Sequence, residues 1–190
     1  MTEIENEKIV YNKRLVIEEA QLIGENKKKF SRLRIKREDA AVVLVINTDS
    51  NKVILTKQFR YPVAAKASEE ILEIVAGKLD EGEEPLAAAL RETEEEIGYK
   101  IKPKNITFLT SCFASPGYSS ERFFIYHATV TDNDKVSSGG GLAAENEHIE
   151  IIELDVDKFK TLIRDGALHD AKTYIAGLYL MMKEGDTTML

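Results

Sequence analysis

The chain has 190 residues, enough for one domain with at most a small appendage. Hydrophobic residues make up 43% of it, which suffices for a buried core, and its net charge of −7 argues against a basic nucleic-acid-binding face. The only cysteine, Cys112, excludes an intrachain disulfide and suits a reducing cytoplasm. The start, MTEIENEK, is unlike a signal peptide, and the longest apolar run, residues 40–46, is too short to span a membrane. We therefore expect a cytoplasmic protein without membrane or nucleic-acid partners.

The predicted elements mix strands and helices along the chain. Two strands are expected over residues 9–17 and 28–37, with a turn at 24–26. The strands expected after them cover residues 40–46, 52–59, 71–75, 106–112, 122–130 and 149–154. Two closing helices are expected, one capped by Asp155 and ending at Gly166, the other capped by Asp170. This order predicts an α/β fold, in which helices cover a sheet.

A further helix is expected within the segment GKLDEGEEPLAAALRETEEEIGY. Pro85 suits a first helical turn and Gly98 suits a C-terminal stop. Glu92, Glu95 and Glu96 would then stand at i, i+3 and i+4, so their carboxylates share one face. This placement makes the three glutamates the strongest candidates for a functional site.

The expected helix has one apolar face and one acidic face, and the acidic face can be interpreted in two ways. Leu86, Leu90, Thr93 and Ile97 fall on a second face, which we expect to pack inward. The three glutamates repel one another, and a hard divalent cation such as Mg²⁺, which prefers oxygen ligands, would offset that repulsion. A solvated acidic helix is the alternative for the glutamates alone.

The whole segment resembles the Nudix box. That motif is glycine, five residues, glutamate, seven residues, and then Arg-Glu-apolar-x-Glu-Glu-x-Gly-apolar. The matching residues are Gly77, Glu83, Arg91, Glu92, Glu95, Glu96, Gly98 and Tyr99. Thr93 departs from the usual larger apolar residue, which concerns packing and not chemistry.

The resemblance implies a Nudix α/β/α sandwich with a mixed sheet over residues 38–190. Residues 1–37 would form a small antiparallel β segment in front of it. Such a segment resembles the one in nucleoside-diphosphate-sugar hydrolases, where it helps to form a homodimer. We therefore expect a dimerisation segment followed by a Nudix domain.

Two further motifs resemble the substrate-binding parts of this branch. The run SPGYSSE, residues 115–121, is by itself a turn signal. It also resembles a signature of ADP-ribose pyrophosphatases and their GDP-mannose-cleaving relatives, which implies that Gly117 and Glu121 line the sugar side of the pocket. Arg60, which ends the run QFR, resembles an arginine that contacts the substrate diphosphate, for which its planar charged fork is suited.

The run SSGGG, residues 137–141, reads by composition as a floppy surface loop. The LAAENE that follows resembles the Gly-Leu-x-x-Glu-x-Glu loop of ADP-ribose and GDP-mannose hydrolases, which carries the glutamate that activates water. Glu145 matches that base, and Glu147 is a candidate metal ligand. The sequence leaves open whether these two roles are reversed.

The activity implied by the resemblance is Mg²⁺- or Mn²⁺-dependent hydrolysis of the diphosphate bond in a nucleoside diphosphate sugar. ADP-ribose, giving AMP and ribose 5-phosphate, is the first choice, and GDP-mannose or another nucleotide sugar is the alternative. A non-catalytic ADP-ribose sensor is a third interpretation, which is disfavoured because all the box carboxylates are present. The nucleobase and the sugar stay open.

The resemblance also assigns roles to the box residues. The implied metal ligands are the Ala76 carbonyl, Glu92, Glu95, Glu96 and Glu147. The implied catalytic residues are Glu145, Glu96, Glu95 and Arg91. Glu83 would be either a metal ligand or a structural partner of Arg91, whereas Gly77 and Gly98 shape the backbone.

Overall fold

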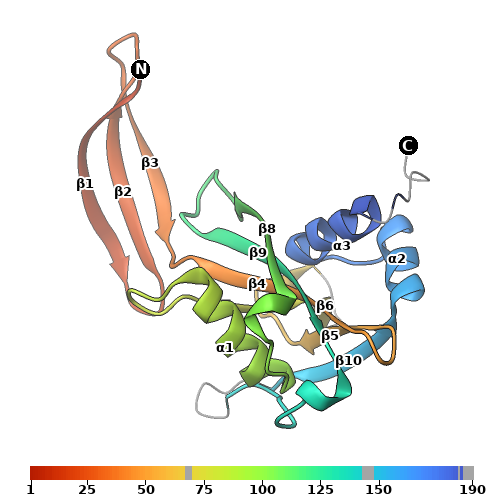
Figure 1. Cartoon of the computed structure of the whole chain (residues 1–190). Helices are drawn as coiled ribbons and strands as arrows, with labels where there is room; N and C mark the ends of the chain where they lie inside the picture. Colours follow the sequence, from red (N-terminus) through yellow and green to blue (C-terminus); the bar gives the residue numbers. More distant parts are fainter. Residues whose placement is uncertain (67–69, 143–147, 184, 186–190) are drawn as a thin grey trace. The chain divides into compact units, whose positions relative to one another are not determined.

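A computed structural model describes residues 1–66, 70–142, 148–183 and 185 (Figure 1). The chain divides into two compact units, each described by itself. One unit is Met1–Asp39 with Cys112–Phe123, and the other is Ala40–Ser111 with Phe124–Leu190.

The first unit is built on a three-stranded antiparallel sheet in the order β1-β2-β3. Its strands are β1 (Glu3–Asn12), β2 (Val16–Ile23) and β3 (Lys29–Lys36). The expected turn at residues 24–26 joins β2 to β3, but the single strand expected over residues 9–17 is wrong, because the chain reverses at Lys13–Leu15. That reversal contains no glycine or proline, so the sequence gives little warning of it.

The second unit contains most of a seven-stranded sheet in the order β10-β5-β4-β9-β8, with β6 beside β5 and β7 beside β4. The strands are β4 (Ala40–Asn47), β5 (Lys52–Gln58), β6 (Ile71–Glu73), β7 (Val75–Lys78), β8 (Ile106–Phe113), β9 (Arg122–Val130) and β10 (Glu150–Asp155). Most bounds agree with the sequence to within a residue or two, although one strand expected over 71–75 is two strands. The strand β6 pairs with β5 and β7 pairs with β4.

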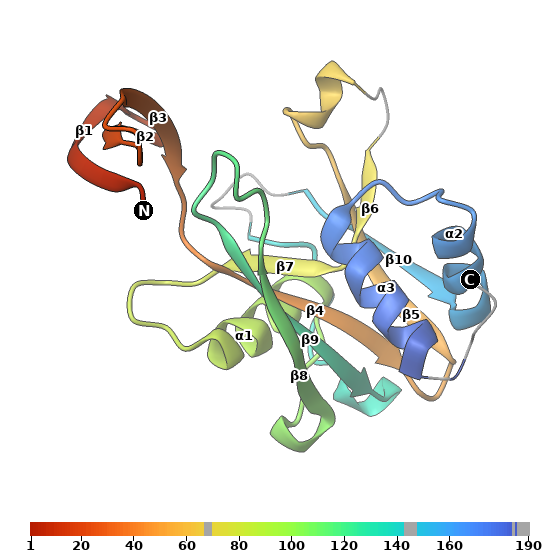
Figure 2. The same cartoon turned by 90° about the horizontal axis from the view of Figure 1, so that it is seen from above.

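Both faces of this sheet are covered. Successive side chains of a strand point to opposite faces, and the five residues from Ala41 to Val45 in β4 are all 0% exposed. Figures 1 and 2 show α1 on one side of β4, and α2 and α3 on the other. The three α-helices are α1 (Pro85–Ile97), α2 (Val156–Arg164) and α3 (Ala171–Lys183). Short 3₁₀ turns are η1 (Val63–Ala65), η2 (Pro103–Asn105) and η3 (Asp132–Asp134). The expected α/β/α sandwich is therefore confirmed.

The inward face of α1 differs from the predicted one. Thr93 and Ile97 are buried as expected, together with Ala89, but Leu86 is 41% exposed. The prediction for Leu86 is wrong because the buried stripe runs along Ala89, Thr93 and Ile97, spaced by four residues. Thr93 is accommodated because its Oγ1 donates a hydrogen bond to the Ala89 carbonyl at 2.7 Å.

The closing helices begin as the sequence predicts, but their caps differ. The Asp170 carboxylate accepts a hydrogen bond from the Thr173 N–H at 2.9 Å, which caps α3. Asp155 occupies the N-cap position of α2 without a side-chain hydrogen bond to the helix. Within the described stretches, no helix combines the length and the apolar character that crossing a membrane requires.

Candidate active site

The helix that carries the acidic trio begins and ends where the sequence predicts. Pro85 occupies the first turn of α1 and needs no hydrogen-bonded N–H there. Gly98 terminates the helix in the left-handed conformation, with φ +76°, and its N–H donates to the Glu94 carbonyl at 3.1 Å.

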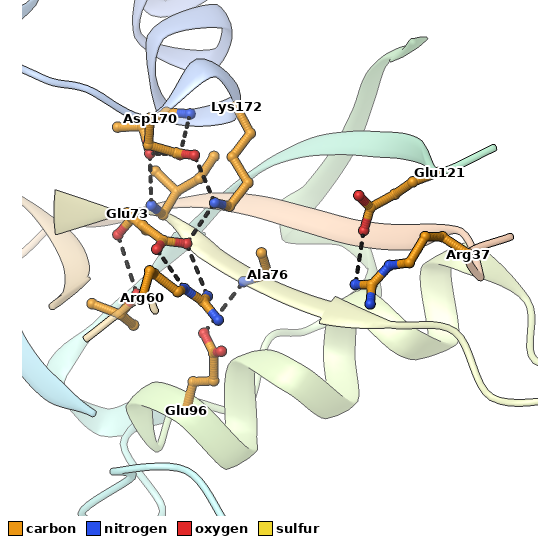
Figure 3. Close-up of polar contacts among 11 residues, drawn as sticks. Arg37, Arg60, Glu73, Ala76, Glu96, Glu121, Asp170 and Lys172 are labelled. Atoms are coloured by element: carbon orange, nitrogen blue, oxygen red, sulfur yellow. Dashed lines mark hydrogen bonds and ion pairs between the residues drawn. The ribbon is translucent and has the colours of Figure 1, made fainter. Parts of the chain in front are cut away.

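Two of the three glutamates lie against the backbone of β7. A Cβ atom added to Gly77 would lie only 1.7 Å from Cδ of Glu92, so the Glu92 carboxylate occupies the space that any side chain at 77 would need. Oε2 of Glu96, whose side chain is buried, accepts a hydrogen bond from the Ala76 N–H at 3.3 Å (Figure 3). The pairing of β7 with β4 therefore places Ala76 and Gly77 directly under the acidic face of α1.

Arg91 forms hydrogen bonds with three glutamates of the segment. Its Nε and Nη2 donate to the two Glu83 oxygens at 3.0 and 2.8 Å, and Nη1 donates to Glu92 at 2.7 Å and Glu95 at 3.2 Å. Hydrogen bonding to Arg91 holds the pKa of the Glu83 carboxyl below its usual value, and the same bond raises the pKa of Arg91. Of the two roles left open for Glu83, the structure displays the partnership with Arg91.

The carboxylate oxygens of Glu92, Glu95 and Glu96 suit a hard cation in their chemistry, although in this structure they accept hydrogen bonds from other groups of the protein. In the described ranges, no group of three or more acidic, histidine or cysteine side chains is gathered closely enough to hold a metal ion. Arg91 and the Ala76 N–H take the carboxylate oxygens instead. The side-chain-free space at Gly77 nevertheless leaves the Glu92 carboxylate beside backbone, and carboxylate and carbonyl oxygens are the ligands that Mg²⁺ accepts.

The glycine tract of residues 139–141 closes the C-terminal end of α1. The N–H groups of Gly140 and Gly141 donate to the carbonyls of Glu96 and Glu95 at 2.8 and 3.2 Å. A Cβ atom on Gly139, whose φ is +64°, would lie 2.6 Å from the Glu96 oxygen. The tract has no helix or strand, as its composition predicts, but its glycines are not a loose surface loop, because they fit tightly against the helix. Glu145 and Glu147, which follow the tract, lie outside the described residues.

Arg60 is fixed on a buried carboxylate that the sequence analysis missed. Its Nε and Nη2 donate side-on to the two oxygens of Glu73, at 2.7 and 3.0 Å (Figure 3). The side chain of Glu73 is only 2% exposed, whereas that of Arg60 is 39% exposed. Lys172, at the start of α3, also donates to Glu73, at 2.5 Å. The available signal was a carboxylate inside the short apolar run ILEIV, residues 71–75, since buried carboxylates need partners.

The predicted sugar-side residues belong to the first unit. Gly117 lies in an exposed turn, where an added Cβ atom would meet nothing within 4 Å. Oε1 of Glu121 accepts a hydrogen bond from Nη2 of Arg37 at 3.3 Å (Figure 3). The role of Gly117 and Glu121 in a sugar site stays a prediction.

A family model and several similar proteins indicate the same family for this chain. The NUDIX domain matches residues 36–176. An ADP-ribose pyrophosphatase of Bacillus subtilis is 37% identical over 156 residues, which are 82% of this chain and 80% of that protein. A methanol dehydrogenase activator of Bacillus methanolicus is 35% identical over 81% of this chain and 78% of its own. A GDP-mannose pyrophosphatase of Shigella flexneri is 32% identical over 79% of this chain and 80% of its own.

A solved structure supports the fold over the full length. The crystal structure of an ADP compounds hydrolase aligns with a TM-score of 0.78, covering 100% of this chain and 97% of that one. Its sequence is 21% identical, so the likeness concerns the fold.

Proposed function

Because this chain belongs to the Nudix family, we propose that it is a pyrophosphatase that cleaves the diphosphate bond of a nucleoside diphosphate sugar. ADP-ribose is the proposed substrate, with AMP and ribose 5-phosphate as products. The relative named ADP-ribose pyrophosphatase, at 37% identity, supports this choice. GDP-mannose is the second candidate, because a relative named GDP-mannose pyrophosphatase is 32% identical over a similar share of the chain.

The observation that carries the proposal is the position of two box carboxylates against β7. Glu92 fills the space left open by Gly77, and Glu96 is held by the Ala76 N–H. Three acidic residues on one helical face repel one another, which favours a role that requires concentrated negative charge. An ADP-ribose sensor without activity would not need this arrangement.

Nudix enzymes need a divalent metal ion, and we propose Mg²⁺ or Mn²⁺ for this one. The Ala76 carbonyl, Glu92, Glu95 and Glu96 would hold it, together with Glu147 beyond the described residues. When bound, the ion supplies positive charge that offsets the negative charge of the diphosphate and of the leaving phosphate.

The protein's own side chains would bind the diphosphate, orient the acidic residues and accept the proton of the attacking water. Arg91 orients Glu92 and Glu95 through the hydrogen bonds of its Nη1. Arg60 binds a diphosphate oxygen, for which a guanidinium is suited. Glu145 accepts the proton of the attacking water while the new P–O bond forms and the bridging P–O bond breaks. Exchanged roles for Glu145 and Glu147 are the alternative.

Residues 1–37 are proposed to form a homodimer of a cytoplasmic enzyme. Support comes from apolar side chains that the first unit leaves exposed: Ile4 at 61%, Ile9 at 56%, Val10 at 47% and Leu33 at 58%. Exposed apolar residues gathered on one small sheet are typical of a protein-protein contact.

A hydrolysis panel tests the proposed function. Purified protein is incubated with Mg²⁺ or Mn²⁺ and ADP-ribose, GDP-mannose, UDP-glucose or diadenosine polyphosphates, and the products are separated by anion exchange. The expected result is metal-dependent release of AMP from ADP-ribose. Binding of ADP-ribose without turnover would favour the sensor interpretation. Turnover of none of the four would refute the proposal.

A further inference from the structure

A four-residue charge cluster links Arg60 to the first turn of α3. Its members are Arg60, Glu73, Lys172 and Asp170. Nζ of Lys172 donates to Glu73 at 2.5 Å and to Asp170 at 2.8 Å. Asp170 also accepts a hydrogen bond from the Oγ1 of Thr173 at 2.6 Å, and that Oγ1 accepts the Ile74 N–H at 2.9 Å. The start of α3 is therefore bonded both to the Glu73 carboxylate and to the chain between β6 and β7.

The cluster engages one edge of the Arg60 guanidinium and leaves another edge available. Glu73 takes Nε and Nη2, while Nη1 makes no hydrogen bond to any described residue. Figure 3 shows the guanidinium between the carboxylates of Glu73 and Glu96. The hydrogen bond to Glu73 and the charges of Glu73, Glu96 and Asp170 raise the pKa of Arg60. The available edge thus lies beside the acidic helix, where the proposed metal ligands are.

Stability alone is a weak explanation for this cluster. Glu73 and Lys172 are nearly inaccessible to solvent, with side chains 2% and 9% exposed. Burial by itself raises the pKa of Glu73, but Arg60 and Lys172 outweigh it, so that this pKa lies below its usual value. Taking such charges out of water costs about as much as their attraction returns, and apolar residues can often replace a buried ion pair without loss of stability. A demand on the geometry of Arg60 accounts better for the four charges.

We propose that Glu73 and Lys172 are positioning residues, which hold the Arg60 guanidinium so that its outer edge meets the substrate's diphosphate beside α1. The proposal rests on the proposed function, because it takes a diphosphate as the group that Arg60 binds. Glu73 fixes the plane of the guanidinium through two parallel hydrogen bonds. Lys172 keeps the Glu73 carboxylate in place and balances its charge.

A double-mutant cycle separates positioning from a structural role. The variants are Glu73→Gln, Arg60→Gln and the combination of both, with Lys172→Met as a second probe of the cluster. Asp134→Asn is the matched control, because its carboxylate is also buried and paired with a lysine, Lys102, at 2.6 Å. KM and kcat are measured with ADP-ribose, and the Kd for α,β-methylene-ADP with Mg²⁺ is measured by calorimetry, which needs no turnover. Urea melts monitor folding.

We expect Glu73→Gln to raise KM and Kd about 10- to 100-fold with a smaller change in kcat, the size of one charged hydrogen bond to a phosphate. The double variant should be no worse than Arg60→Gln, because Glu73 acts through Arg60. Lys172→Met should raise KM less than Glu73→Gln does, and Asp134→Asn should leave KM unchanged while lowering the urea midpoint.

Two results would overturn the positioning role. One is a folded Glu73→Gln variant with wild-type KM and Kd. The other is a double variant in which the fold-increase in KM equals the product of the fold-increases in Glu73→Gln and Arg60→Gln. If Glu73→Gln does not fold, a wild-type KM in Lys172→Met would overturn the role equally. A wild type that hydrolyses nothing in the panel would refute the proposed function, while the Kd series would still decide on positioning. A wild type that fails to bind α,β-methylene-ADP would overturn both.

Discussion

The space at Gly77 allows a sharp test of the acidic helix through the substitution Gly77→Ala. The new Cβ atom would lie 1.7 Å from Cδ of Glu92, whereas ordinary contact begins at 3.4 Å. The carboxylate must therefore withdraw by about the difference, 1.7 Å, or the β7 backbone must move. Since a misplacement of about 1 Å in a catalytic group can cost about 100-fold in rate, we expect kcat/KM to fall by at least about 100-fold.

The same substitution should change stability little. The backbone φ at Gly77 is not positive, so alanine fits the local conformation. Alanine also restricts the unfolded chain, which stabilises a protein by about 0.4–1 kcal/mol. Displacing the Glu92 carboxylate disturbs its partly exposed ion pair with Arg91, and such pairs contribute about 0–1 kcal/mol. We expect the free energy of unfolding to change by no more than about 1 kcal/mol in urea melts.

The assay is kcat/KM for ADP-ribose together with a Mn²⁺ titration, and Gly24→Ala is the control. The nearest atoms to a Cβ at Gly24 lie at 3.4 Å, an ordinary contact, so this variant should keep its activity. If Gly77→Ala retains more than a third of the wild-type kcat/KM, then the position of Glu92 does not matter for activity and its proposed role as a metal ligand is refuted.

The remaining predictions concern other parts of the molecule. Glu96→Gln should lower kcat by orders of magnitude with little change in the urea midpoint; more than half of the wild-type rate at saturating Mg²⁺ would contradict the assignment. Glu145→Gln should lower kcat about 10²- to 10⁴-fold with unchanged KM, whereas Glu147→Gln should shift the Mg²⁺ dependence; the reverse pattern would exchange their roles. Light scattering should give twice 21.3 kDa for the intact chain, and removal of residues 1–37 should give a monomer. The pKa of Asp134 is lowered to about 2 by its bonds to Lys102 and Thr131. Its stabilising effect should therefore be complete above its unfolded pKa of about 3.9 and disappear as the pH falls through about 2. Urea melts of the wild type and Asp134→Asn should converge in that window; a difference that does not shrink between pH 4 and pH 2 would exclude this cause.

The ends of α1 and the bounds of β9 could be predicted from the sequence, because residues within each element determine them. The helix α1 begins at Pro85 and stops at Gly98, because proline needs no N–H in a first turn and glycine accepts a positive φ. The predicted strand at residues 122–130 coincides with β9, because aromatic and β-branched residues, above all the run FFIY at 123–126, dominate it.

Contacts between distant residues could not be predicted in the same way. Glu73 and Lys172 are 99 positions apart, and neither residue by itself indicates the other as its partner. The glycine tract was interpreted from composition, which predicts flexibility, whereas close packing against Glu96 determines its conformation. In both cases the outcome depends on contacts between residues far apart in the chain, which a short window of sequence does not contain.

The closure of α1 by the glycine tract has a consequence for the order of folding. The last carbonyls of the helix, on Glu95 and Glu96, receive their hydrogen bonds from residues about 45 positions later in the chain. During synthesis on the ribosome, the acidic helix can form its first turns early, but its final turn is completed only after Gly141 has emerged. A fragment that ends before Ser137 would contain the whole Nudix box and still leave that turn open to fraying. The box is thus a complete motif in sequence but an incomplete folding unit.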